Sequence, residues 1–318
     1  MSWIRLPGVE YESVLLASDL PAWLIRGAAL VFGALWGSFF NVAIYRWPRG
    51  MSVVKPPSHC PACGAPVRWY LNVPILGFVL LRGRARCCGA KMTSRYVWVE
   101  VLGAVLCMAV AERFVLSGDP ENTAAHALID TLLYFAFVGG LLVATFVDLE
   151  WMEIPDEVSL PGAALGLATV GLRTGPGPLS AAVGAGIGFL IVQGLFVVAY
   201  ELIAGRRGMG EGDAKLLLMI GAFLGWEAVL FALVAGSMQG LLAAGLATAF
   251  GIPLVPALPD EDLPEQAGPS AEENAEPVAE TPAGPTMMVF GPMLALSALE
   301  FLFFGDAILA WLSIRFAG

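Results

Sequence analysis

Long apolar runs separated by short polar segments make up most of this sequence. A helix needs roughly 20 apolar residues to cross a hydrocarbon core about 30 Å thick. Runs of this kind occur at residues 22–45, 97–117, 126–148, 157–173, 179–204, 216–254 and 289–314. The run 216–254 is too long for one crossing, and Gly225-Trp226-Glu227 is the natural place to divide it. The pattern predicts an all-α polytopic membrane protein with about eight transmembrane helices.

Composition supports this interpretation. Hydrophobic residues make up 58% of the 318 residues and charged residues only 14%, whereas soluble domains carry about 25% charged residues. The net charge of −10 comes mainly from residues 260–280, which hold eight carboxylates and no Lys or Arg. Without them the net charge is −2, so the acidity gives no reason to expect a nucleic-acid partner.

The basic residues predict how the chain is oriented in the bilayer. Twelve of the 17 Lys and Arg residues lie in 46–96 and 205–215, and basic loops face the cytoplasm. Residues 1–20 carry three carboxylates and do not have the pattern of a secretory signal. The expected organisation is an external N-terminal segment (1–21), a first transmembrane helix (22–45), a cytoplasmic cysteine-containing loop (46–96), a transmembrane core (97–255), an acidic disordered cytoplasmic insert (256–288) and a last transmembrane helix (289–318).

Two aspartates stand at the ends of predicted spans. Asp148 closes the run 126–148, and a carboxylate at a membrane boundary is costly enough to need a reason. Asp213 follows a glycine-rich segment in which Gly210 and Gly212 permit a close backbone approach. Each aspartate also has a simpler interpretation: Asp148 as a helix-end residue that reaches water, and Asp213 as an N-cap. A phosphate-binding loop is less well supported, because no Walker Lys-Ser/Thr pair follows the glycines.

The two aspartates together favour catalysis. Both are predicted at the cytoplasmic face, and two carboxylates brought close in a low dielectric share one proton. The ionised partner can deprotonate a water molecule while the protonated partner polarises a carbonyl. The main alternative is an ion- or proton-coupled transporter, which would require carboxylates near the middle of the membrane.

Four of the five cysteines form a second group, in the basic loop. Cys60 and Cys63 have the knuckle spacing of a zinc site. A matching second knuckle would begin with a cysteine at position 85, where the chain has Ala85, and Cys87 and Cys88 follow it. The candidate metal ligands are Cys60, Cys63, Cys88 and either Cys87 or His59. The alternatives are a loop without metal, or a non-catalytic scaffold with a zinc knuckle.

Read in order, these motifs resemble those of the bacterial prepilin leader peptidase/N-methyltransferases, a Gly-x-Gly-Asp class of aspartyl peptidase. The resemblance runs from about residue 22 to 310 and rests on several motifs in the same order. They are GSFFNVAIYR (37–46), PSHCPAC (57–63), WYLNVP (69–74), LRGR (81–84), SRY (94–96), Glu100, Asp148, IPD (154–156), GEGDAK (210–215), GAFLGW (221–226) and FGP (290–292).

The resemblance implies an enzyme of the bacterial inner membrane whose catalytic residues are Asp148 and Asp213, with Gly210, Gly212 and Lys215 in the supporting loop. It implies cleavage of the short basic leader of type IV prepilins or pseudopilins after a Gly, followed by methylation of the new N-terminus with S-adenosylmethionine. The loop 46–96 is associated with methylation and zinc. A peptidase-only member is an alternative, because Ala85 replaces a cysteine of the family's zinc pattern.

Overall fold

The computed structural model describes residues 19, 21–119, 121–199, 201–202, 210–251 and 289–316. The predicted external segment 1–21 therefore lies almost wholly outside the described residues, and so do the acidic insert 256–288 and the basic residues Arg206 and Arg207. Over the described residues the chain is helical and forms no strand, only two isolated β-bridges. The predicted all-α class is confirmed.

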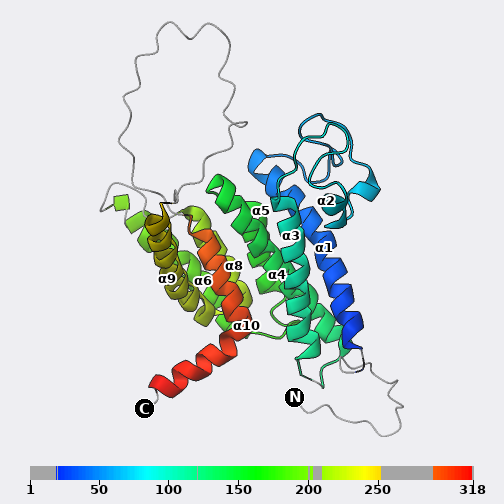
Figure 1. The fold of residues 1–318 in the computed structure, drawn as a ribbon. Helices are drawn as coiled ribbons and strands as arrows, with labels where there is room; N and C mark the ends of the chain where they lie inside the picture. Colours follow the sequence, from blue (N-terminus) through cyan, green and yellow to red (C-terminus); the bar gives the residue numbers. More distant parts are fainter. Residues whose placement is uncertain are drawn as a thin grey trace, which may run out of the picture. The chain divides into compact units, whose positions relative to one another are not determined.

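Within the described residues, eight longer helices lie over the predicted apolar runs (Figure 1). They are α1 (Ala22–Arg46), α3 (Arg95–Ala111), α4 (Ala124–Trp151), α5 (Asp156–Ala168), α6 (Pro178–Leu190), α8 (Glu211–Leu224), α9 (Trp226–Phe250) and α10 (Gly291–Phe316). The shorter elements are α2 (Leu76–Leu80), the 3-10 turns η2 (Trp47–Arg49) and η3 (Trp69–Leu71), and the π-helical segments η4 (Glu112–Leu116) and η5 (Ile191–Ala199).

Four of these helices are long and apolar enough to cross a membrane. They cover Ala22–Arg49, Ala124–Trp151, Trp226–Phe250 and Gly291–Trp311. The run 216–254 is divided where the sequence predicts. Gly225 separates α8 from α9 with φ +87 and ψ 179, a conformation that side chains disfavour.

The chain forms two compact units. The first takes Met1–Phe39, Ser58–Phe137 and Leu172–Thr174, and the second takes Phe40–Pro57, Val138–Gly171 and Gly175–Gly318. The helices α1 and α4 contribute residues to both. Residues 58–96 of the cysteine loop, with its four cysteines, belong to the first unit, whereas Asp148 and Asp213 belong to the second.

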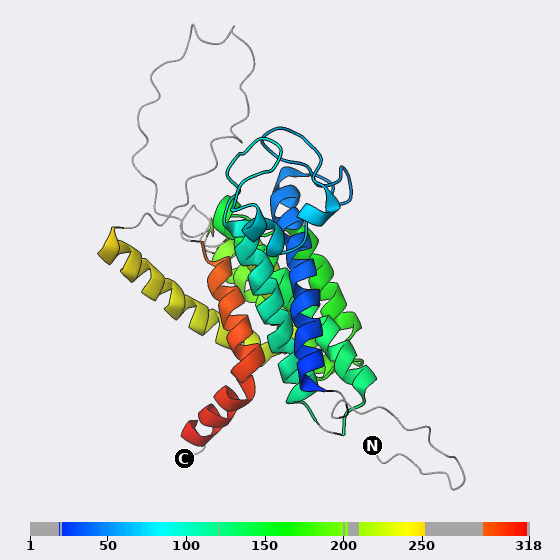
Figure 2. The same cartoon turned by 45° about the vertical axis from the view of Figure 1, so that its right-hand side comes forward.

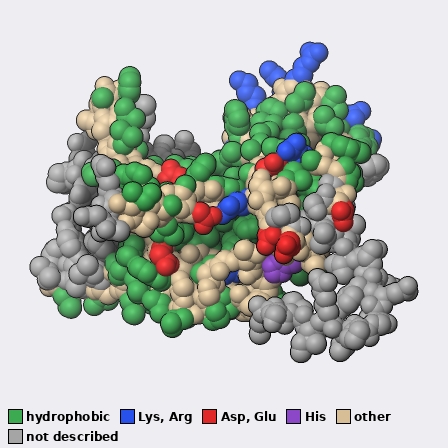
Figure 3. Space-filling model, turned by 90° about the horizontal axis from the view of Figure 1, so that it is seen from below, with side chains coloured by type: hydrophobic (Ala, Val, Ile, Leu, Met, Phe, Trp, Pro, Cys, Tyr) green, Lys and Arg blue, Asp and Glu red, His purple; other side chains and the backbone are tan. Residues whose placement is uncertain are grey.

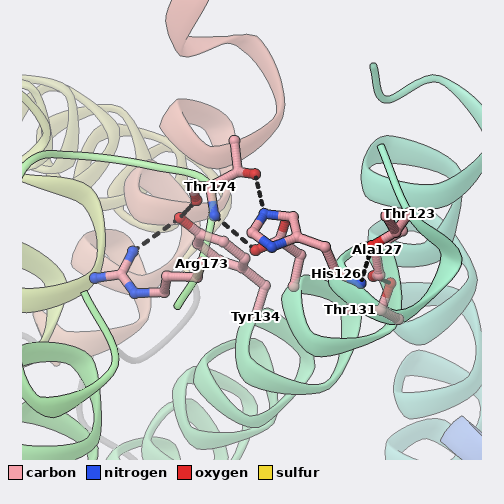
Figure 4. Close-up of polar contacts among 8 residues, drawn as sticks. Thr123, His126, Ala127, Thr131, Tyr134, Arg173 and Thr174 are labelled. Atoms are coloured by element: carbon pink, nitrogen blue, oxygen red, sulfur yellow. Dashed lines mark hydrogen bonds and ion pairs between the residues drawn. The ribbon is translucent and has the colours of Figure 1, made fainter. Parts of the chain in front are cut away.

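In the first unit, a polar cluster joins α4 to the segment 172–174 (Figure 4). The buried Asp130 carboxylate accepts a hydrogen bond from the Thr174 N–H at 2.7 Å. The Tyr134 hydroxyl donates to the Thr174 carbonyl at 2.6 Å and accepts from Arg173 at 2.9 Å. His126 contacts the Thr174 hydroxyl at 3.2 Å. These bonds give partners to Asp130 Oδ1, the Tyr134 hydroxyl and Arg173 Nη1, which would otherwise be costly to bury.

In the second unit, α8 is the central helix and packs against α5, α6, α9 and α10 (Figures 1 and 2). Its side chains Leu216, Leu217, Ile220 and Phe223 are fully buried. Because α8 carries Asp213 in its first turn, this packing fixes the position of one candidate catalytic group.

Apolar side chains also cover much of the outside. Figure 2 shows α9 diverging from the other helices of the second unit toward its C-terminal end, and there Met238, Leu241 and Phe250 are each at least 67% exposed. Figure 3 views the molecule from below and shows exposed hydrophobic side chains there too, with Asp, Glu, Lys, Arg and His side chains among them. Such a surface is unfavourable in water and is expected of helices surrounded by lipid.

The contact between α6 and α8 depends on close backbone approach at Gly184. A Cβ atom there would lie 2.5 Å from the Gly225 carbonyl carbon and 2.6 Å from the Trp226 nitrogen. Gly184→Ala is therefore expected to destabilise the protein by about 1–3 kcal/mol, the usual cost of overpacking. The measurement is the thermal unfolding midpoint in detergent.

Gly186 provides the matched control, since it lies on the same helix and a Cβ there would meet nothing within 4 Å. Gly186→Ala should leave the midpoint unchanged or raise it slightly, because Ala favours the helix over Gly. Equal midpoints for the two variants would contradict the tight α6–α8 contact.

Candidate active site

Asp148 lies inside α4, which continues to Trp151. Its side chain is buried, and Oδ2 accepts a hydrogen bond from the Gly291 N–H at 2.9 Å. The simpler interpretation of Asp148, as a helix-end residue that reaches water, is therefore wrong. A buried carboxylate needs hydrogen-bond donors or a shared proton to offset its desolvation.

Asp213 is the third residue of α8 and is also buried. The N-cap position belongs to Gly210, so the interpretation of Asp213 as an N-cap is wrong by three residues. Its carboxylate instead accepts a hydrogen bond from the Gly210 N–H. This is the reciprocal half of a capping box, in which the third residue of a helix reaches back to the N-cap.

The fold brings the two aspartates together. Asp148 and Asp213 lie near enough for their charges to interact. Buried Ile154 lies against the backbone that holds each of them: a Cβ at Gly212 would be 2.9 Å from Ile154 Cβ, and one at Gly291 would be 3.1 Å from Ile154 Cδ1. Two carboxylates in this setting favour the state with one proton between them.

Lys215 supports the site from outside. Its Nζ contacts both carboxylate oxygens of Asp156, at 2.6 and 2.7 Å, and so links the second turn of α8 to the first residue of α5. Both side chains are partly exposed, and exposed ion pairs contribute little stability. The pair therefore orients α8 relative to α5 more than it stabilises the fold.

In the first unit, the sulfur atoms of Cys60, Cys63, Cys87 and Cys88 all lie within 4.8 Å of one another. None of them forms a disulfide. Of the two candidates for the fourth ligand, the structure brings Cys87 into the cluster and leaves His59 outside it. Four thiols that converge in this way suit a tetrahedral cation such as Zn²⁺.

Two matching turns build this cysteine cluster. In the first turn the Cys60 N–H donates to Ala65 O and the Gly64 N–H donates to Cys60 O, both at 2.8 Å. In the second turn the Ala85 N–H donates to Ala90 O and the Gly89 N–H donates to Ala85 O, again at 2.8 Å. A β-bridge closes each turn, His59 with Pro66 and Arg84 with Lys91. Ala85 thus takes the place of Cys60, while Cys87 supplies the fourth sulfur from within the second turn.

The thiols are not equivalent. Burial raises the pKa of the Cys60 thiol, but the N–H groups of Ala62 and Cys63 outweigh it and lower that pKa to about 7. Hydrogen bonds with the sulfurs of Cys63 and Cys60 raise the pKa of Cys87 to about 12. Four neighbouring thiolates repel one another, and a divalent cation would remove this repulsion.

Sequence reasoning missed the roles of Gly291 and Ile154 beside the aspartates. The motifs FGP (290–292) and IPD (154–156) could have indicated these roles, because each lies at the start of an apolar helix. Cys107 is buried within α3 and does not belong to the cysteine cluster.

Comparison with known proteins identifies the family. The family described as "Bacterial Peptidase A24 N-terminal domain" matches residues 31–114, and the "Type IV leader peptidase family" matches residues 135–254. No solved structure matches the chain.

Several relatives are named prepilin leader peptidase/N-methyltransferase. The protein from Myxococcus xanthus is 33% identical over an alignment covering 93% of this chain and 95% of the relative. The one from Aeromonas salmonicida is 31% identical, covering 93% and 96%. A protein from Klebsiella pneumoniae is 36% identical over 62% of this chain and 84% of its own length. This chain therefore belongs to the prepilin leader peptidase/N-methyltransferase family.

Proposed function

We propose that this protein cleaves the leader peptide from type IV prepilins or pseudopilins and methylates the N-terminus that cleavage exposes. The observation that carries the peptidase assignment is the meeting of two buried aspartates, Asp148 and Asp213, from separate helices of one compact unit. Paired carboxylates of this kind are suited to hydrolysis of an amide bond.

In the proposed mechanism, one aspartate is ionised and the other holds a proton. The ionised carboxylate takes a proton from water, and the resulting hydroxide attacks the carbonyl carbon of the scissile peptide bond. The protonated carboxyl donates a hydrogen bond to the carbonyl oxygen. When the C–N bond breaks, the leaving nitrogen receives a proton from the pair, and the products are a carboxylate and an amine.

For the cysteine cluster we propose a zinc ion held by Cys60, Cys63, Cys87 and Cys88. The convergence of the four sulfur atoms supports this, and so does the donation of backbone N–H groups to Cys60. Zn²⁺ with four thiolates is a closed structural site, so we propose that it stabilises the loop 46–96 and takes no part in hydrolysis. S-adenosylmethionine is the proposed methyl donor, and we assign no residue to its binding.

We propose that all eight longer helices lie in the bacterial inner membrane. The loop 46–96, the aspartate pair and the insert 256–288 would face the cytoplasm, and residues 1–21 would face outward. At 14 residues α8 is about 21 Å long, shorter than the hydrocarbon core, but its neighbours α5, α6, α9 and α10 bury it. Asp148 lies in the last turn of α4 and Asp213 in the first turn of α8, away from the middle of either helix, which favours a peptidase over a proton-coupled transporter.

The test uses membranes containing this protein, a type IV prepilin and S-adenosylmethionine, with the product analysed by mass spectrometry. The expected product lacks its leader and carries one added methyl group on the new N-terminus. Cleaved but unmethylated product would identify a peptidase-only enzyme. An uncut substrate, with the protein folded and present, would refute the proposed function.

A further inference from the structure

The N-terminus of α10 reaches the aspartate pair from beyond the region that the peptidase family matches. That match ends at residue 254, whereas α10 begins at Gly291. The Gly291 N–H nevertheless donates to Asp148 Oδ2, across 143 residues of sequence and in a buried environment. We propose that Gly291 is a positioning residue for the peptidase reaction, holding one oxygen of Asp148 so that the other is directed to the reacting water or proton. This inference rests on the proposed function.

The position of Gly291 in the helix explains why its N–H is available. The first N–H groups of a helix have no acceptor within it, and the positive end of the helix dipole favours a carboxylate. The next residue, Pro292, has no N–H to donate. Gly291 is thus the donor that the first turn of α10 can offer to Asp148.

The site also requires the absence of a side chain at position 291. A Cβ atom there would lie 2.5 Å from Asp148 Oδ2, 3.2 Å from Asp148 Cγ and 3.1 Å from Ile154 Cδ1. A residue with a Cβ atom does not fit at position 291 in the present arrangement. Any residue other than Gly must therefore displace Asp148, Ile154 or the end of α10. A shift of this kind alters the position of the carboxylate relative to Asp213.

Contacts with α9 hold α10 in place. The Gln239 side-chain amide donates to Glu300 at 2.9 Å, and the rings of Phe231 and Phe301 lie 5.6 Å apart. These contacts connect α10 to the matched peptidase region.

The test compares Gly291→Ala with wild type in the prepilin cleavage assay, using full-length protein in membranes. We expect kcat to fall about 10- to 100-fold, the range for displacement of a catalytic group by about an ångström, with KM nearly unchanged. The acid limb of the pH profile of kcat should also move to higher pH. The reason is that the added Cβ displaces the carboxylate from the N–H of residue 291, and this hydrogen bond stabilises the ionised form of Asp148, whose facing titratable partner is Asp213.

Gly236→Ala is the matched control. Gly236 lies where α9 meets α10, and a Cβ there would make only ordinary contacts, at 3.4 Å to Leu294 Cδ2 and 3.5 Å to Met293 O. Its kcat and pH profile should match those of wild type. If Gly291→Ala does not accumulate, the double variant Ile154→Val/Gly291→Ala is used. It removes the Ile154 Cδ1 atom that the new Cβ would crowd, and it is compared with Ile154→Val alone.

The outcomes separate the two proposals. A wild-type protein that leaves prepilin uncut contradicts the proposed function itself. A wild-type protein that cleaves, together with a Gly291→Ala variant that has the same kcat and the same pH profile, overturns the positioning role of Gly291. A loss of kcat with an unshifted pH profile would mean general disruption of packing and would also overturn it.

Discussion

Replacing either Asp148 or Asp213 with Asn is expected to lower the rate of leader cleavage by about 10²–10⁴-fold, the range that general acid–base groups contribute. Asn has nearly the same shape as Asp and can still accept a hydrogen bond from the Gly291 or Gly210 N–H. It can neither ionise nor hold the transferred proton. The measurement is the initial rate of leader removal in membranes, scored by mass spectrometry.

Because the two carboxylates act as one unit, the double variant should be hardly slower than either single variant. Glu153→Gln is the matched control, since Glu153 is an exposed carboxylate between Asp148 and α5. It removes the same charge and should retain wild-type cleavage. Wild-type cleavage by either Asn variant would remove that aspartate from the mechanism.

The second large effect is expected at the cysteine cluster. Cys87→Ser should reduce the metal that survives a chelator wash from a stoichiometric amount to almost none, because three thiols cannot close a structural zinc site. Adding Ala85→Cys to Cys87→Ser should restore it, because Ala85 occupies the turn position that Cys60 occupies in the first turn. Metal analysis of the purified protein measures both results.

Cys107→Ala controls for loss of a thiol outside the cluster and should leave the metal content unchanged. Leader cleavage should persist in Cys87→Ser, because the aspartate pair belongs to the other compact unit. Full metal retention by Cys87→Ser would exclude Cys87 as a ligand. Failure of the double variant to regain metal would contradict the equivalence of the two turns.

The sequence predicts the helices well because their cause is local. Long apolar runs form helices through their own composition. The break between α8 and α9 is also local, because Gly225 adopts a positive φ that other residues disfavour. The ends of the helices are less predictable. The predicted apolar run 126–148 ends at Asp148, yet α4 continues through Leu149 and Glu150 to Trp151, because one charged residue does not end a helix.

The site is only partly predictable, since its contacts join distant residues. The motifs around Asp148 and Asp213 indicate two carboxylates, but nothing local indicates that Gly291 donates to Asp148. The same holds for the bond between Asp130 and Thr174, which are 44 residues apart. For the metal ligands the sequence leaves Cys87 and His59 open, and the choice of Cys87 depends on the path of the second turn.

The matching turns of the cysteine loop have a consequence for how such proteins are recognised. The backbone bonds of the second turn persist with alanine at its first position, so the path of the chain does not depend on a sulfur there. The candidate ligand can then stand at the third position of the turn instead of the first with the same backbone bonds. Searches that require two intact Cys-x-x-Cys pairs will overlook chains of this kind, whereas a search for four sulfurs on two equivalent turns will find them.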